Sequence, residues 1–168
     1  RVLLPLVFCR ECGQDYFCVW KTTDADDASG RRFTSRELTD SLNDDAQEAG
    51  FLYVSSDDPW PHDPQALLQR LPDDWVEEPR GVLRLRSGRR DALPQAVRVG
   101  TDGTESEDGM DCHYIPAPFR FCLHCGVSYD FRQTSDFGKL TTLGTEGRST
   151  ATTLLSLSAI RRLRNEPT

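Results

Sequence analysis

Apolar residues along this chain gather in short runs between polar segments, which is the pattern of a β-rich fold. Residues 2–8 are mostly apolar and predict a strand, and residues 16–20 are rich in β-forming side chains and predict the strand that returns beside it as a hairpin. Residues 51–54 and 96–99 predict two more strands, and residues 82–86, which alternate towards their end, predict another. We therefore expect a sheet built from several short strands.

Helices are predicted in fewer places. Pro64 favours the first turn of a short helix, and residues 151–164 predict a longer helix whose apolar side chains point nearly all round its axis, so that it needs cover on several sides. Residues 41–49 are ambiguous and are compatible with a short polar helix. Residues 73–79 are expected to be a linker, and residues 100–109 an acidic, mobile loop.

Two C-x-x-C-G segments, which we call the hooks, stand at the tips of predicted hairpins. The second follows an extended segment, residues 114–121, in which two prolines favour an edge strand, and precedes a predicted return strand at 126–131. Two thiolates of one tight turn can face the same cation, and the glycine allows the left-handed backbone of such a turn. Two matching hooks predict one zinc site with four thiolate ligands. These are Cys9, Cys12, Cys122 and Cys125.

The predicted zinc site is structural. Four sulfurs at about 2.3 Å fill the tetrahedral shell and leave no position for water or substrate. Six cysteines would suggest disulfides in a secreted protein, but the sequence shows no signal peptide, so zinc in a reducing cytoplasm is favoured. The alternative that Cys112 or His113 replaces a cysteine of the second hook stays open.

Charge is unevenly distributed along the chain. Because the net charge is −7, the surface as a whole is not expected to attract nucleic acid electrostatically. No apolar run approaches the roughly 20 residues of a membrane span, so no membrane contact is expected. Arginines cluster in residues 80–90, where they either balance the acidic surface or form a strip that contacts phosphate through their forked donors. The candidate DNA contacts in this strip are Arg84, Arg86, Arg89 and Arg90.

No catalytic residue is assigned. The sequence holds no G-x-S-x-G, no H-E-x-x-H and no zinc-deaminase motif. Residues 144–150 resemble a phosphate loop only superficially, because Arg148 stands where a lysine would and the glycine spacing differs. Arg148 is nevertheless a further candidate for contact with nucleic acid, because the start of the predicted helix favours an anion beside it. The alternative is an ordinary helix cap by Ser149 or Thr150.

Two parts of the chain resemble a known family. Residues 4–16, with the first hook, and the second hook followed by residues 140–154 are similar to an internal segment of large bacterial DEAD/DEAH-box helicases of superfamily 2, of the type with a cysteine-bearing C-terminal domain. In that family a region with cysteine hooks separates two RecA-like motor domains, and a Glu-Gly-Arg-Ser stretch, here residues 146–149, opens the second motor domain. Residues 22–111 take no part in the resemblance.

The resemblance implies a segment of a longer protein. The expected fold is α+β, with zinc-ribbon hairpins, a small mixed or antiparallel sheet and a trailing α-helix. Residues 1–139 would form the zinc-ribbon domain with an acidic insertion at about 22–111, and residues 140–168 the start of a following RecA-like motor domain. The segment itself would hold no ATP-binding residue, since ATP and Mg²⁺ would bind only in the motor domains of the parent protein.

Two functions are weighed. The first is an accessory structural-zinc domain of an ATP-dependent helicase, which braces the motor domains of the same chain and contacts DNA. The alternative is a zinc-ribbon module for protein–protein interaction, in which the acidic insertion and an exposed Trp60 or Trp75 dock a partner subunit without nucleic acid.

Overall fold

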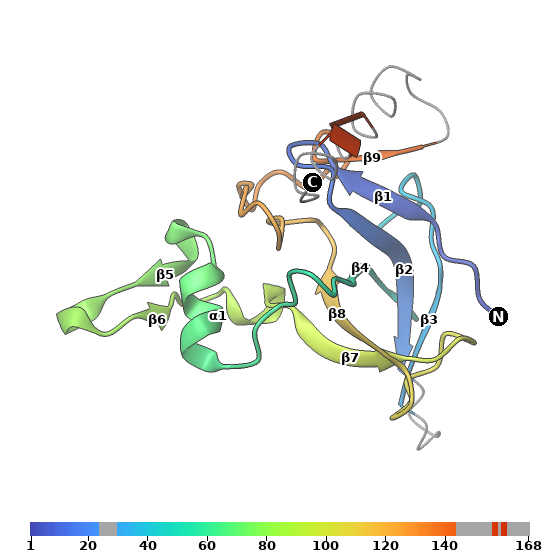
Figure 1. Cartoon of the computed structure of the whole chain (residues 1–168), viewed down its shortest axis with the longest axis horizontal. Coiled ribbons are helices and arrows are strands. Elements are labelled where there is room, and N and C mark those ends of the chain that lie inside the picture. Colours follow the sequence, from blue (N-terminus) through green and yellow to red (C-terminus); the bar gives the residue numbers. More distant parts are fainter. Residues whose placement is uncertain (24–29, 144–155, 158, 161–168) are drawn as a thin grey trace, which may run out of the picture.

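The computed structural model describes residues 1–23, 30–143, 156, 157, 159 and 160, and its centre is an antiparallel sheet (Figure 1). Seven strands form this sheet in the order β7-β8-β4-β2-β1-β9, with β3 also paired to β2. The strands are β1 (Leu6–Cys9), β2 (Asp15–Thr23), β3 (Arg31–Ser35), β4 (Glu48–Tyr53), β7 (Gln95–Val99), β8 (Met110–Pro116) and β9 (Leu140–Thr142). The expected combination of antiparallel strands with helix is confirmed.

The sheet buries apolar side chains on both faces, because successive side chains of a strand point to opposite sides. In β2, Tyr16 and Cys18 face the larger core cluster, whereas Val19 faces the smaller one. Strand β4 lies between β2 and β8, and five of its six residues are buried, which explains its apolar sequence. The predictions of strands at 16–20, 51–54 and 96–99 are confirmed.

An arm projects from the sheet between β4 and β7 (Figure 1). It contains α1 (Pro64–Arg70), the short strands β5 (Val76–Glu77) and β6 (Arg84–Leu85), and three short 3₁₀ turns, Asp73–Trp75, Pro79–Gly81 and Arg90–Ala92. The predicted helix start at Pro64 is confirmed, and the Asp63 side chain caps it by accepting from the Ala66 N–H. The predicted strand at 82–86 is confirmed only as the two residues of β6.

The two tryptophans of the arm are buried. Trp60 is 1% exposed and Trp75 is 0% exposed, and their rings lie 5.8 and 4.8 Å from the ring of Phe121. Residues 73–79 are therefore not a free linker. The expectation of an exposed Trp60 or Trp75 as a docking side chain is wrong, because both rings pack with Phe121 in the larger core cluster.

Three further predictions of local structure are corrected. Residues 41–49 form no helix, and their last residues belong to β4. Strand β8 is an inner strand between β7 and β4, not an edge, and Pro116 is tolerated because it is the last residue of β8. The return segment 126–131 makes one isolated bridge, Phe121 with Ser128, instead of a strand.

The acidic loop 100–109 is closed by backbone hydrogen bonds such as Gly100 N–H to Thr104 O, at 2.8 Å.

The chain returns to the sheet after the second hook. Strand β9, which was expected to belong to the following domain, pairs with β1, and its Leu140 is fully buried. The division at residues 139 and 140 stays a prediction.

Arg148 lies outside the described residues. Of the predicted helix 151–164 only residues 156, 157, 159 and 160 are described, and all four are helical. Within the described part of the chain, no helix has the length and apolar character needed to cross a membrane.

Candidate metal centre

The two hooks have the same backbone conformation. The Cys9 carbonyl accepts from the Gly13 N–H at 2.8 Å, and the Cys122 carbonyl accepts from the Gly126 N–H at 2.9 Å. Each glycine has a positive φ, 79° and 76°, which is the left-handed conformation that glycine adopts without strain. In each hook the first cysteine also donates its N–H to the carbonyl five residues later. The shared C-x-x-C-G sequence therefore produces the same turn twice.

The four hook sulfurs lie within 4.8 Å of one another. The Cys9 and Cys125 sulfurs are 4.0 Å apart, and the Cys12 and Cys122 sulfurs are 3.7 Å apart. A tetrahedral zinc ion with bonds of about 2.3 Å requires its sulfurs to be about 3.8 Å apart. The predicted convergence of these four cysteines is present, and its dimensions fit a metal ion such as zinc.

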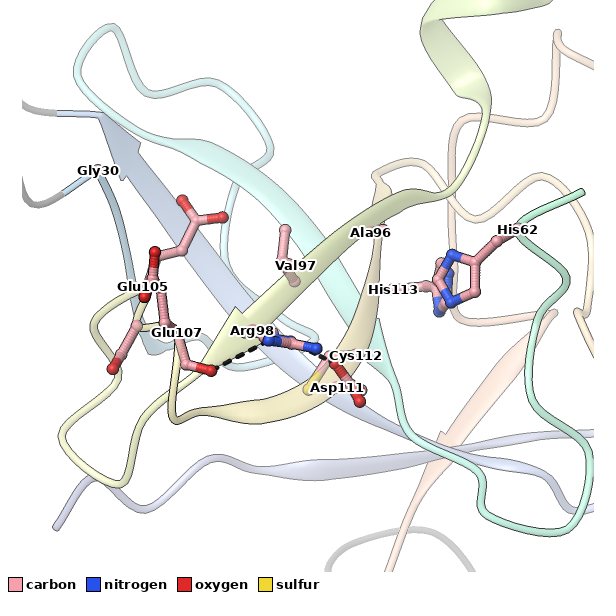
Figure 2. A pocket seen from close by; sticks show the side chains of 11 residues that line it. Gly30, His62, Ala96, Val97, Arg98, Glu105, Glu107, Asp111, Cys112 and His113 are labelled. Atoms are coloured by element: carbon pink, nitrogen blue, oxygen red, sulfur yellow. Dashed lines mark hydrogen bonds and ion pairs between the residues drawn. The ribbon is translucent and has the colours of Figure 1, made fainter.

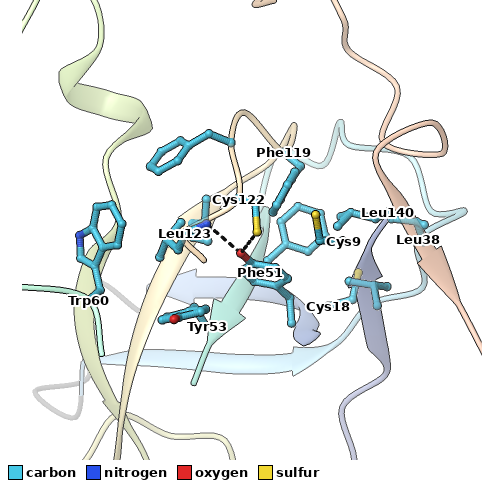
Figure 3. Close-up of a cluster of buried hydrophobic side chains, with 14 of the residues drawn as sticks. Cys9, Cys18, Leu38, Phe51, Tyr53, Trp60, Phe119, Cys122, Leu123 and Leu140 are labelled. Atoms are coloured by element: carbon cyan, nitrogen blue, oxygen red, sulfur yellow. Dashed lines mark hydrogen bonds between the residues drawn. The ribbon is translucent and has the colours of Figure 1, made fainter. Parts of the chain in front are cut away.

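The centre is anchored in the larger core cluster. Cys9 and Cys122 are both fully buried and belong to that cluster, together with Phe119 and Leu140 (Figure 3). Cys12 is half-buried and Cys125 is exposed. One side of the centre therefore packs against the sheet and the other side faces solvent, so that a metal ion could enter at Cys125.

Contacts among the thiols of Cys9, Cys12 and Cys122 change their pKa values when no metal is bound. Hydrogen bonds from the Cys12, Cys9 and Tyr16 side chains lower the pKa of Cys122 to about 2 despite its burial. A hydrogen bond with Cys12 favours the Cys9 thiolate, but the hydrogen bond with Cys122 and burial outweigh it and raise the pKa of Cys9 to about 12. Hydrogen bonds with Cys122 and Cys9 raise the pKa of Cys12. A metal ion must therefore displace protons to bind.

Tyr16 is part of this centre, although sequence reasoning did not identify it. Its hydroxyl oxygen lies 3.1 Å from the Cys122 sulfur and accepts from the Leu123 N–H at 2.9 Å. Burial, followed by the charge of Cys122, raises the pKa of Tyr16. A tyrosine follows each hook at the same spacing, and nothing in the sequence distinguishes Tyr16 from Tyr129.

The other cysteines and histidines lie outside the centre. The Cys112 thiol donates to the Met110 carbonyl at 3.2 Å, and the His113 ring packs against His62. Among the described residues, the cluster that could hold a metal comprises the four hook cysteines, without Cys112 or His113. His124 points away from the centre, since it is exposed and its Nδ1 lies 3.1 Å from an Asp58 oxygen.

A polar pocket of about 710 Å³ lies beside β7 and β8 (Figure 2). Two of its acidic residues are paired within the fold: Asp111 accepts from Arg98 Nε at 2.7 Å, and Glu105 accepts from Arg31 Nε at 2.8 Å. Burial, together with the neighbouring His62, lowers the pKa of His113. These residues come from separate segments with no shared motif, so sequence analysis could not group them.

The arginine strip is divided in the structure. Arg84 pairs with Glu77 at 2.7 Å, and Arg86 Nε donates to the Val76 carbonyl at 2.9 Å. The Arg89 guanidinium stacks on the ring of Phe131 at 3.9 Å and is half-buried. The side chains of Arg84, Arg86 and Arg90 are therefore exposed on the arm, whereas Arg89 is used for packing.

The chain was compared with protein-family models, with curated proteins and with solved structures, and nothing matches it. The four-cysteine cluster is thus the feature with the most specific chemistry in the described part of the molecule.

Proposed function

We propose that this chain is a zinc-ribbon module of an ATP-dependent nucleic-acid helicase, located between two motor domains of the same protein. The observation that carries the proposal is the four-sulfur cluster at the Cys9 and Leu140 end of the β1–β9 pair, opposite the end at which the chain enters and leaves the sheet. When bound, zinc supplies four metal–sulfur bonds that connect segments far apart in sequence. Such a link stabilises most where the closed loop is long.

The pairing of β1 with β9 supports the position within a longer chain. Val7 lies opposite Thr142 and Cys9 opposite Leu140, in antiparallel register. The segments by which the chain enters and leaves the sheet therefore lie side by side. A module whose ends are neighbours can be inserted into a host protein without disturbing the host fold. The nature of the neighbouring domains rests on the resemblance of residues 4–16, 121–126 and 140–154 to the helicases. ATP and Mg²⁺ would bind in those domains.

The metal part of the proposal is tested by zinc content. We expect one zinc ion per chain by elemental analysis, and loss of that ion in Cys9→Ser and Cys122→Ser. Cys112→Ser is the matched control, because Cys112 is equally buried but lies outside the cluster. A wild-type chain without stoichiometric metal, or serine variants that keep it, would disprove the structural-zinc role.

The DNA part is tested on the arm. The variant Arg84→Ala/Arg86→Ala/Arg90→Ala removes three exposed charges and leaves the packed Arg89 intact. For each of these arginines that binds a phosphate, its removal should reduce the slope of log K against log salt by about 0.9. The matched control, Arg1→Ala/Arg32→Ala/Arg132→Ala, removes three exposed charges elsewhere. Equal DNA affinity and salt slope in both variants would remove the DNA contact from the proposal.

A protein-interaction module is the second candidate. It is favoured by the net charge of −7 and by the ion pair of Arg84 with Glu77, which places both signs of charge on the arm. In that case the arm contacts a partner subunit. The arm variant should then lose co-purification with a partner while the control variant keeps it, and DNA binding should be negligible in both.

A further inference from the structure

The hydroxyl group of Tyr16 lies between the metal centre and the backbone of the second hook. It is 3.1 Å from the Cys122 sulfur and 2.9 Å from the Leu123 nitrogen. The backbone N–H of Leu123 can only donate, so it occupies an acceptor position of the hydroxyl. The hydroxyl proton is then free to point to sulfur. A metal-bound Cys122 is a thiolate with no proton to donate, so in the metal-bound centre the Tyr16 hydroxyl is the donor of this hydrogen bond.

We infer that Tyr16 is a positioning residue of the metal centre, which donates a hydrogen bond to the metal-bound Cys122 sulfur and holds the second hook in place. The inference rests on the proposed zinc site and deepens it. It assigns to a residue of the first hairpin a role at a ligand of the second hook.

Burial makes this donor important. Four thiolates around a divalent cation carry two excess negative charges, and the fully buried Cys122 sulfur cannot be solvated by water. A buried phenol keeps its proton at neutral pH, so the Tyr16 hydroxyl is available as a donor. Removing a hydrogen-bond partner of a metal ligand typically reduces metal affinity about 10–100-fold.

Packing holds the hydroxyl at this place. Tyr16 is 0% exposed, and its ring lies 5.2 Å from the ring of Phe119 and 5.7 Å from that of Tyr53. Tyr16 also lies in β2, opposite Val7 of β1. The ring is thus fixed by the core, and a hydroxyl fixed in this way can orient the sulfur before the metal arrives.

The second hook provides a matched comparison. Tyr129 follows Cys125 at the same spacing at which Tyr16 follows Cys12. Tyr129 is only half-buried, and its hydroxyl makes no hydrogen bond with the described residues. The two hooks have the same backbone turn but differ in this contact, so Tyr129→Phe removes an equivalent hydroxyl without affecting a ligand.

The test compares Tyr16→Phe and Tyr129→Phe in the full chain. Zinc affinity is measured by competition with a chelator, and the sulfur-to-metal charge-transfer band is recorded with Co²⁺ in place of zinc. Tyr16→Phe should lower the affinity about 10–100-fold. It should also shift the band to lower energy, because a sulfur without its hydrogen-bond donor gives up electron density more readily. Tyr129→Phe should change neither value.

The outcomes separate the inference from the proposed zinc site. A wild-type chain that binds neither zinc nor Co²⁺ overturns both. A wild-type chain that binds metal, with equal affinity and an equal band in Tyr16→Phe, overturns the role of Tyr16 alone. A lower affinity with an unmoved band would show that the hydroxyl acts on the hook backbone and not on the sulfur, which also overturns the inference as stated.

Discussion

Replacement of Lys139 by methionine removes the charge that holds the segment after the second hook against the core. The Lys139 Nζ donates to the carbonyls of Phe119 and Gln133 at 2.8 and 2.7 Å and to Asp136 Oδ1 at 3.2 Å. The side chains of Lys139 and Asp136 are only 3% and 5% exposed. Methionine fills a similar volume, so the change tests the charge and its hydrogen bonds more than the packing.

The expected loss of stability follows from the buried Asp136 carboxylate that the substitution leaves unpaired. Asp136 would stay buried without its cation. Its Oδ1 would keep the Phe119 N–H as a donor at 2.8 Å, and its Oδ2 has no hydrogen-bond partner in the described part of the chain. Breaking a buried ion pair by removing one partner costs about 3–5 kcal/mol. For a chain of this size that corresponds to a fall in Tm of about 6–20 °C. Urea unfolding, followed by the fluorescence of the buried tryptophans at a fixed zinc concentration, measures the loss.

Lys21→Met is the matched control, since Lys21 and Lys139 are the two lysines of the chain. Lys21 pairs with Glu48 at 2.6 Å, but the Glu48 side chain is 65% exposed and returns to water when its partner is removed. We expect a cost of about 1 kcal/mol or less for this exposed carboxylate. Equal losses in the two variants would refute the reasoning. Adding Asp136→Asn to Lys139→Met should recover part of the stability, because it neutralises the stranded charge.

Three further changes have defined outcomes. Gly50→Ala should destabilise the fold by about 1–3 kcal/mol in urea unfolding, because an added Cβ would collide with the Tyr114 ring in the neighbouring strand. Arg36→Met should stabilise it by about 1–4 kcal/mol, since the Arg36 guanidinium is buried without a hydrogen bond to any described residue, and a lower Tm would contradict this. A hydrogen bond from Arg31 lowers the pKa of Glu105 below its usual 4.5, so this pair stabilises the fold above that pH and is lost as the pH falls through the lower folded-state pKa. Tm measured against pH should therefore fall less steeply in acid for Glu105→Gln than for the wild type.

Local chemistry was predictable from the sequence. The hooks carry their geometry in five consecutive residues, because the cysteine spacing and the glycine at Gly13 or Gly126 determine the turn. The start of α1 at Pro64 and the strands around Phe51 and Val97 follow from similarly local patterns. These features depend on interactions between near neighbours, which a linear pattern records.

Features that depend on distant partners were not predictable. The burial of Trp75 depends on Phe121, which is supplied by the approach to the second hook. The place of β9 in the sheet depends on the free edge of β1, and its sequence is too short to show a strand period. The contact of Tyr16 with Cys122 likewise depends on the fold bringing the two hooks together.

The pairing of β1 with β9 also determines how the module would respond to pulling. Force applied through the segments on either side of the sheet acts at the Val7 and Thr142 end of this strand pair. Antiparallel strands loaded from one end lose their hydrogen bonds one after another, with little resistance. The opening then reaches Cys9, where metal–sulfur bonds to the second hook would carry the load together. A filled metal centre would act as a mechanical stop, which lets the edge of the sheet yield while the core stays closed.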